Sequence, residues 1–208
     1  MKQLEALLPA ETGYCRAAPG HPFHGPYHDD EYGFRVTGDA AIFERLTLEV
    51  FQAGLSWLLC LKKRAGFSHA FAEFDIDRVA QFGEEEIRNL LTRPAIIRHR
   101  GKIEATIHNA RQLQELRGSH GSLVNWLDSN HPSSLASWQK LMRKRFKFAG
   151  PEVVREFVAS LGYLPDAHGT ICPAYHRAID LGAPWAAIPA LCLGDHLLGD
   201  TLQKPVDQ

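Results

Sequence analysis

Amphipathic helical periodicity is the feature that most constrains how this chain folds. Residues 151–162 carry one apolar stripe at helical spacing, formed by Val153, Val154, Phe157, Val158 and Leu161. Such a stripe is typical of a helix that packs one face against a core. Pro151 suits the first helical turn and Gly162 suits the stop, so both boundaries are marked.

Several other segments repeat this pattern. Apolar residues at helical spacing predict helices over 39–53, 84–91, 102–117, 122–128 and 135–146. Gly54 and Gly118 are expected to end the first and third of these, and Ser134 is a suitable N-cap for the last. No segment alternates apolar and polar residues over a strand length. The sequence therefore predicts an all-α domain of several helices with short links.

Composition excludes several classes of protein. The chain has 208 residues, a net charge of −1 and 45% hydrophobic residues, which is too apolar and too weakly charged for a disordered chain. No apolar run approaches the 18 residues typical of a transmembrane helix, and the first residues do not read as a secretory signal. We expect a cytoplasmic protein of one main domain that contacts no membrane and is a monomer by default.

The cysteines raise the question of a metal. Cys15, Cys60, Cys172 and Cys192 are scattered, so a disulfide framework is not expected in a reducing compartment. Each is a candidate for an ordinary buried apolar residue. However, Cys15 with His28, and His168 with Cys172, provide two thiols and two imidazoles, the donors that structural zinc prefers. The pairs lie about 140 residues apart, so spacing alone is a weak indication.

Two positions near the end of the 39–53 helix are candidates for recognising a flat ring. Glu49 shares a helix face with apolar residues, where a carboxylate is costly without a partner or a task. Trp57 follows shortly after, and a tryptophan beside a carboxylate suits stacking of a nucleobase. The alternatives are a glutamate that reaches solvent at the edge of the stripe and an ordinary core tryptophan.

Two further segments carry polar chemistry. Residues 27–33, with sequence Tyr-His-Asp-Asp-Glu-Tyr-Gly, are dense in aromatic and acidic groups, although a plain polar loop is the alternative. Residues 144–151 form a basic turn between two amphipathic helices, whose exposed amides suit a DNA phosphate. An ordinary αα-hairpin with a solvated basic face is the alternative. Basic clusters at 62–64, 98–102 and 143–147 indicate a one-sided nucleic-acid footprint despite the balanced charge.

Taken together in this order, these segments resemble the type I 3-methyladenine DNA glycosylase family over roughly residues 15–172. The residues that carry the resemblance are Tyr27–Glu31, Leu48–Glu49, Gln52–Trp57, Leu61–Arg64, Ile96–Ile103, Asn109–Arg111 and Phe146–Gly150. The set is far more specific than any single motif within it.

The resemblance implies a helix–hairpin–helix fold with one structural Zn²⁺ per chain. By this likeness the zinc ligands are Cys15, His28, His168 and Cys172, the catalytic, base-reading carboxylate is Glu49, and the base pocket holds Tyr27, Trp57 and Tyr32. DNA-binding residues implied at the hairpin are Arg145, Lys147, Phe148, Ala149 and Gly150. The chain departs from the family pattern at Tyr32, where tryptophan is usual, at Ala17, where an aromatic residue is usual, and at Phe51, where glutamine is common.

The resemblance also implies an organisation and an activity. A helical glycosylase domain is expected over 15–176, with the helix–hairpin–helix at about 135–162, an N-terminal extension over 1–14 and a C-terminal extension over 177–208. The implied activity is excision of 3-methyladenine from alkylated double-stranded DNA, which releases the free base. The alternatives are a protein that binds alkylated DNA with weak or altered activity, and a zinc hydrolase. The latter is disfavoured because the protein would fill all four metal positions.

Overall fold

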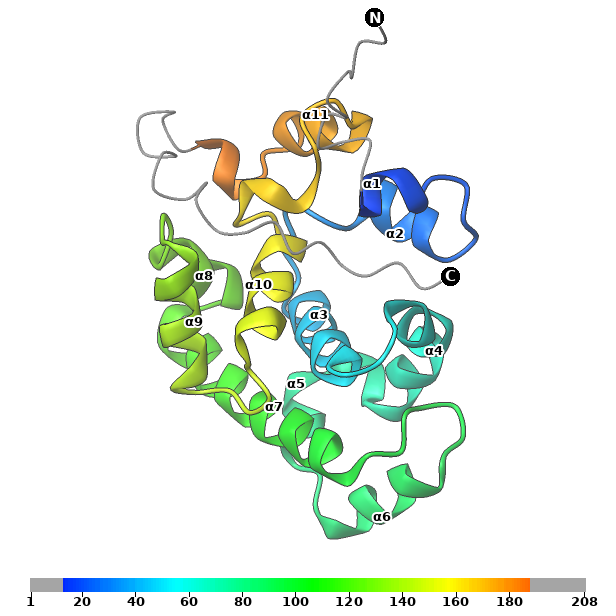
Figure 1. The fold of residues 1–208 in the computed structure, drawn as a ribbon. Helices are drawn as coiled ribbons and strands as arrows, with labels where there is room; N and C mark the ends of the chain where they lie inside the picture. The colour runs from blue at the N-terminus through cyan, green and yellow to red at the C-terminus, as the bar shows by residue number, and fades with distance from the viewer. Residues whose placement is uncertain (1–12, 188–208) are drawn as a thin grey trace, which may run out of the picture.

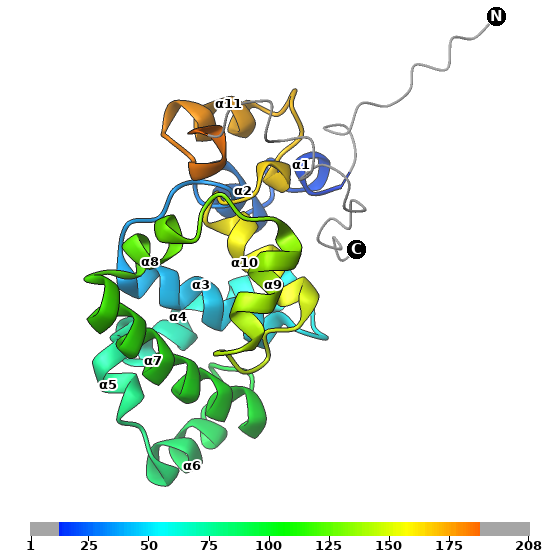
Figure 2. The ribbon, with the colours of Figure 1, turned by 90° about the vertical axis from the view of Figure 1, so that its left-hand side faces the viewer.

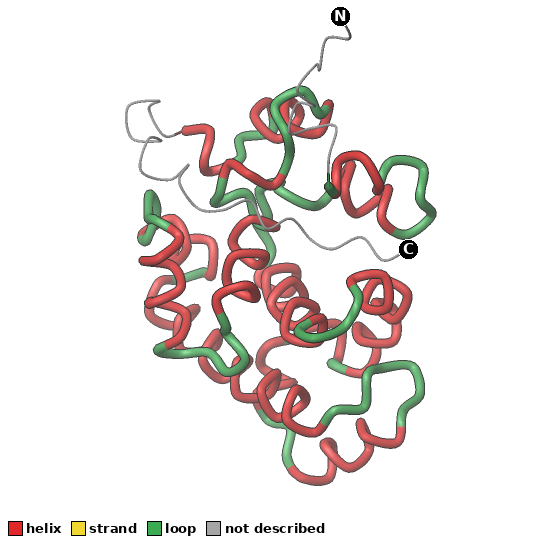
Figure 3. Tube along the Cα trace, in the orientation of Figure 1, coloured by secondary structure: helices red, strands yellow, loops and turns green. Residues whose placement is uncertain are grey.

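The computed structural model describes residues 13–187, and every regular element within that range is helical (Figure 3). Expectations for residues 1–12 and 188–208, including Cys192 and most of both extensions, lie outside the described residues. The elements are α1 (Tyr14–Ala17), α2 (His24–Asp30), α3 (Asp39–Gln52), α4 (Trp57–Ala70), η2 (Ala72–Phe74), α5 (Ile76–Ala80), α6 (Glu84–Thr92), α7 (Arg100–His120), α8 (Leu123–Ser129), α9 (Leu135–Arg143), α10 (Pro151–Ser160), η3 (Pro165–Ala167), α11 (Pro173–Asp180) and η4 (Pro184–Ala187). The prediction of an all-α fold is confirmed.

Helix α3 is the centre of the molecule. It packs against α4, α7 and α10, while α8 lies on α7 and α9 pairs with α10 (Figure 1). Helices α1, α2 and α11 gather at one end, and α5 and α6 lie at the other, as the rotated view also shows (Figure 2). Because α3 touches helices from both halves of the chain, residues on it face groups that are distant in sequence.

Local signals explain most helix boundaries. The side chains of Ser56, Ser122 and Ser134 accept hydrogen bonds from backbone amides three residues later, which caps α4, α8 and α9. Gly54 adopts a φ of +76° just after α3, a conformation that glycine reaches without strain. Helix α10 starts at Pro151 and ends before Gly162, as the sequence predicts.

Other boundaries differ from the prediction. Gly118 does not end the long helix, since α7 continues to His120 and stops at Gly121, whose φ is +81°. Helix α9 ends at Arg143 rather than residue 146. Helix α7 thus passes the glycine that the sequence offered as a terminator and ends at the next glycine, which is left-handed. Helix α9 ends without a left-handed residue, since its C-cap Lys144 keeps helical angles.

The ends of the described chain are more ordered than the sequence suggested. Residues 24–30 form α2 rather than a polar loop, and α11 continues through residue 177 to Asp180. Trp185 is buried against Phe34, Cys172 and Ala178. The residues directly after 176 therefore pack on the domain as far as η4.

None of the helices between residues 13 and 187 combines the length and hydropathy needed to cross a bilayer.

Candidate functional site

Four side chains from opposite ends of the described chain meet in one Cys/His cluster. The donor atoms of Cys15, His28, His168 and Cys172 all lie within 4.8 Å of one another. Cys15 Sγ is 3.7 Å from His168 Nδ1, and Cys172 Sγ is 3.7 Å from His28 Nε2. Donors around a tetrahedral zinc ion, with its usual bond lengths, lie about 3.6 Å apart, so the spacing fits such an ion. The sequence pairs are thus brought together.

Hydrogen bonds fix which imidazole nitrogens face the centre of this cluster. His28 Nδ1 lies 2.7 Å from Asp29 Oδ1, and His168 Nε2 lies 2.7 Å from the backbone oxygen of Tyr32. Each outer nitrogen therefore donates its proton away from the centre, and the inner nitrogen keeps its lone pair, as in metal-bound histidines. Burial lowers the pKa of His168 to about 4, which favours the neutral, ligating form.

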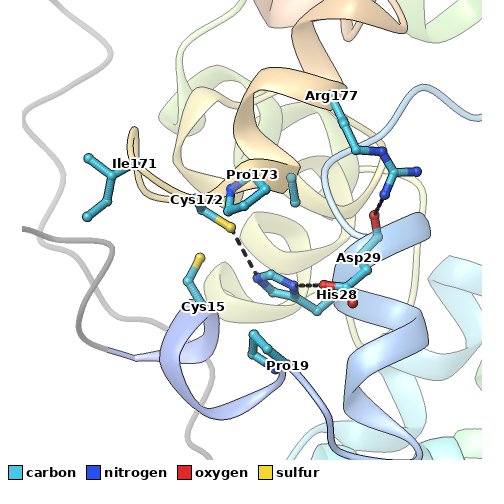
Figure 4. Close-up of a pocket in the computed structure, with 9 residues that line it drawn as sticks. Cys15, Pro19, His28, Asp29, Ile171, Cys172, Pro173 and Arg177 are labelled. Carbon is cyan, nitrogen blue, oxygen red and sulfur yellow. Dashed lines mark hydrogen bonds and ion pairs between the residues drawn. The ribbon is translucent and has the colours of Figure 1, made fainter.

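A pocket of about 470 Å³ opens beside the Cys/His cluster. Figure 4 shows the thiols of Cys15 and Cys172 directed toward the His28 ring, with Arg177 placed at the far side. Arg177 Nη1 donates to the backbone oxygen of Asp29 at 3.0 Å. Burial raises the pKa of Cys15 to about 11, and a divalent cation would counter this by stabilising the thiolate.

A second group of residues, called here the aromatic cluster, comprises Tyr14, Tyr27, Tyr32 and Trp57. The ring centre of Tyr27 is 4.9 Å from that of Trp57 and 5.8 Å from that of Tyr32. Tyr14 stands edge-on to Tyr32 at 5.7 Å. All four rings are buried. The predicted residues Tyr27, Trp57 and Tyr32 thus lie together, and Tyr14 joins them, although its sequence context gave no indication of this.

Glu49 does not reach solvent, so that alternative is wrong. Its side chain on α3 is 1% exposed. The pKa of Tyr14 is raised above its ordinary value by burial first, then by Tyr27 and then by the charge of Glu49. The buried carboxylate therefore lies within electrostatic reach of the aromatic cluster. Phe51, two residues later, packs on Phe67 at 4.5 Å and belongs to the core, and Ala17 is exposed.

The sequence missed a second buried carboxylate. Glu156 on α10 is 6% exposed. Its Oε2 accepts a hydrogen bond from the Tyr32 hydroxyl at 3.0 Å, and its Oε1 is 2.7 Å from Arg155 Nη1. Arg155 Nη2 also donates to Asp166 Oδ2 at 2.5 Å. No local pattern marks Glu156 because α10 appears as a simple amphipathic helix.

The acidic residues just after Tyr27 are engaged elsewhere. Asp29 pairs with His28, Asp30 pairs with Arg177, and Glu31 accepts hydrogen bonds from Arg45 and Arg64 at 2.6 Å each. Burial acts to raise the pKa of Glu31, but the two arginines outweigh burial and hold that pKa below its ordinary value. All three carboxylates are thus engaged in ion pairs, and we assign none of them as a general base.

Lys102, from a predicted basic cluster, is a buried structural cation. It is 4% exposed, and its Nζ donates to the backbone oxygens of Phe51 and Ala53 at 2.7 and 2.6 Å. Burial lowers its pKa. The ammonium group closes the C-terminal end of α3, where backbone carbonyls lack helical partners, and so holds the turn that joins Glu49 to Trp57.

We expect Lys102→Met to destabilise the fold by about 2–3 kcal/mol, since two backbone carbonyls lose a charged donor. Urea denaturation followed by circular dichroism measures this change. Lys63→Met is the matched control, because Lys63 also donates to a backbone carbonyl, that of Pro94, but at an exposed position. Equal losses in the two variants would contradict the role of Lys102.

The basic turn between α9 and α10 is held by α7. The side chain of Asn109 donates to the backbone oxygen of Lys147 at 3.1 Å and accepts from the Lys147 amide at 2.8 Å. Phe148 adopts a φ of +56° and is 42% exposed. Arg145 and Lys147 are exposed, Gly150 is half-buried and Ala149 is buried. Four of the five predicted DNA-binding residues are therefore at least partly exposed, while Ala149 is buried.

One arginine in each of the other two basic clusters is tied to acidic partners. Arg64 bonds Glu31 and Glu44, and Arg100 bonds Glu84 and Glu104. With Lys102 buried, the turn at 143–147 has the densest group of exposed basic side chains among the three predicted clusters.

Comparison with known proteins decides the family. A sequence profile described as methyladenine glycosylase matches residues 17–136. The chain is 35% identical to the DNA-3-methyladenine glycosylase 1 of Escherichia coli K12 over 180 residues, which covers 77% of this chain and 96% of that relative. The chain belongs to the methyladenine glycosylase family. The matched profile spans Glu49, one member of the Cys/His cluster, His28, and three of the four rings of the aromatic cluster, with Tyr14 outside it.

Other members of the methyladenine glycosylase family agree. A DNA-3-methyladenine glycosylase of Haemophilus influenzae is 32% identical, with 71% of this chain and 89% of that protein covered. A solved structure of 3-methyladenine DNA glycosylase I from Staphylococcus aureus, which describes 3-methyladenine recognition, is 31% identical. It superposes with a TM-score of 0.71 over 80% of this chain and 96% of that one.

Proposed function

We propose that this chain hydrolyses the N-glycosidic bond of 3-methyladenine in alkylated DNA. The observation that carries the proposal is the buried carboxylate of Glu49, which acts electrostatically on a cluster where the rings of Tyr27 and Trp57 lie 4.9 Å apart at a tilt of 59°. A carboxylate accepts hydrogen bonds from the amino edge of adenine, and aromatic faces attract a cation. The similarity to two curated glycosylases over most of their length supports the same activity.

The reaction begins with extrusion of the lesion from the duplex. A damaged base costs less to unstack than an intact one, so flipping itself selects for the lesion. We assign Trp57 and Tyr27 to stacking the flipped base and Glu49 to its hydrogen-bonding edge. Tyr32 forms a further side of this site.

Bond cleavage needs little help at the leaving group. Methylation at N3 makes the base cationic, so the electron pair of the C1′–N9 bond neutralises the base as that bond breaks. Water then adds to the oxocarbenium-like C1′ and loses a proton to solvent, leaving an abasic sugar and free 3-methyladenine. The negative charge of Glu49 stabilises the cationic base and the developing sugar cation.

The turn between α9 and α10 is assigned to the DNA backbone, as a helix–hairpin–helix. Exposed Arg145 and Lys147 flank the start of α10, where amides and the helix dipole attract a phosphate. Asn109 fixes the turn through both its hydrogen bonds to Lys147. The turn is thus shaped before DNA binds, which reduces the ordering cost of binding.

We expect Lys147→Ala to weaken duplex binding about threefold to tenfold and to reduce the slope of log affinity against log salt by about one phosphate contact. Fluorescence anisotropy at several salt concentrations measures both quantities. Arg88→Ala, which removes an exposed cation on α6, is the control and should change neither. An unchanged salt slope in Lys147→Ala would remove this residue from the DNA interface.

The Cys/His cluster is assigned to one structural zinc ion. Two thiolates and two neutral imidazoles form a closed tetrahedral set, which leaves no position for a catalytic water. A bound ion would join α1 and α2 to the segment before α11. With the ion bound, the Cys/His cluster would stabilise the end of the molecule that contains Tyr14 and Tyr32.

The test of the activity is a base-release assay. Purified protein is incubated with methylated duplex DNA, and released bases are separated and quantified. We expect free 3-methyladenine in excess over 7-methylguanine and 3-methylguanine. Tight binding to alkylated DNA without any released base would contradict the proposal. It would favour the alternative of a damage-binding protein, which the departures from the family pattern at Ala17 and Tyr32 motivate.

A further inference from the structure

The aromatic cluster is bordered by a charge network on α10 and η3 that the mechanism above does not use. The network comprises Arg155, Glu156 and Asp166. Arg155 and Glu156 are 7% and 8% exposed at their side chains, and Asp166 is 33% exposed. One guanidinium faces two carboxylates, so the network carries a net charge of −1.

This network contacts the aromatic cluster through Tyr32. The Tyr32 hydroxyl donates to Glu156 Oε2 at 3.0 Å, and the Tyr32 ring lies 5.8 Å from Tyr27. Burial first, and the Glu156 carboxylate next, raise the pKa of Tyr32 well above its ordinary value. Glu156 also contributes, after Glu49, to the raised pKa of Tyr14. Two carboxylates on different helices therefore act on the same buried rings.

Charges on the opposite side of the cluster balance one another. Arg45 lies over the Tyr27 ring at 4.7 Å, and its Nη2 is 2.6 Å from Glu31. Arg64 bonds both Glu31 and Glu44. Two arginines on α3 and α4 thus face two glutamates, one on α3 and one just after α2, so this side adds no net charge to the site.

We propose that Glu156 is a specificity-determining residue that favours cationic bases through its charge. The residue acts at a distance: its network adds a second negative charge to that of Glu49, while Tyr32 separates it from the base. A cationic alkylated purine is attracted by both charges, whereas a neutral purine keeps only its hydrogen bond to Glu49. This inference rests on the proposed base site and adds that the site selects cationic bases over neutral ones by their charge.

The expected size of the effect follows from Coulomb's law. A unit charge roughly 10 Å from a cation, at an effective dielectric constant of about 20, changes the affinity for that cation by about tenfold. The affinity for a neutral purine of similar shape changes little. The ratio of the two affinities therefore reports the charge, while a loss of packing lowers both affinities together.

The experiment compares two purines by isothermal titration calorimetry at mildly alkaline pH. The cationic probe is 3,9-dimethyladeninium, in which a methyl group replaces the sugar, and the neutral probe is 3-methyladenine. We expect Glu156→Gln to lower the preference for the cation about tenfold. Tyr32→Phe, which removes the hydroxyl but keeps the charge, should leave that preference within about twofold.

Asp166→Asn provides a second variant of the same network. It removes the outer carboxylate, which is part-exposed, so we expect a smaller decrease in the cation preference with an intact fold. If Glu156→Gln fails to fold, this variant decides the matter alone. An unchanged preference in a folded Glu156→Gln or, failing that, in Asp166→Asn overturns the inference.

The same titrations distinguish failure of the proposed function from failure of this inference. If Tyr27, Trp57 and Glu49 do not form a base site, the wild-type chain binds neither purine. If the base site is correct but the charge filter is not, the wild-type chain binds both purines and every variant keeps the same preference.

Discussion

Glu49→Gln is expected to release 3-methyladenine about 10²–10³-fold more slowly than the unchanged chain, the range found when one electrostatic stabiliser is removed from an active site. Glutamine keeps the size of the side chain and one acceptor oxygen but removes the negative charge. Because Glu49 is buried within electrostatic reach of the aromatic cluster, water replaces that charge poorly.

Single-turnover base release from methylated duplex DNA measures this effect without interference from product dissociation. Glu115→Gln on α7, at an exposed position, is the matched control and should leave the rate unchanged. Thermal denaturation confirms that both variants fold. A Glu49→Gln chain that releases the base at the unchanged rate would disprove the role assigned to this carboxylate.

The second large effect is expected at the Cys/His cluster. Cys172→Ala removes one of four donors, and we expect it to abolish stoichiometric zinc binding. Loss of a structural metal belongs to the few changes that cost about 4 kcal/mol or more. For a chain of this size, that loss corresponds to a decrease in Tm of roughly 8–16 °C.

Metal analysis and thermal denaturation test this expectation together. The unchanged chain should contain about one zinc ion, and a strong chelator should lower its Tm while leaving that of Cys172→Ala unaffected. Cys60→Ala is the control, because Cys60 is equally buried but lies outside the cluster. Full zinc content in Cys172→Ala would exclude this thiol from the metal site.

The sequence predicted the fold class well because helical signals are local. Serine caps, left-handed glycines and apolar stripes are all determined within a few residues, as at Ser134 and Gly54. Boundaries failed where tertiary packing competes with a local stop, as at Gly118. The meeting of Cys15 and His28 with His168 and Cys172 depends on the whole fold, so spacing alone indicated it only weakly.

The surroundings of two charged residues could not be predicted from the sequence. Lys102 looked like part of a solvated basic cluster, yet it is buried against two backbone carbonyls. Glu156 looked like the polar side of an amphipathic helix, yet it bonds Tyr32 in the interior. In both cases the partner lies in a distant segment of the chain, which no local pattern reveals.

The position of Tyr32 has a consequence for how the chain is made. Its backbone oxygen is held by His168 and its hydroxyl by Glu156, both of which leave the ribosome more than 100 residues after it. A nascent chain that ends at α9 already contains Tyr27, Glu49 and Trp57 but neither anchor of Tyr32. The proposed base site would therefore be completed only late in synthesis, and partly made chains would lack its finished form.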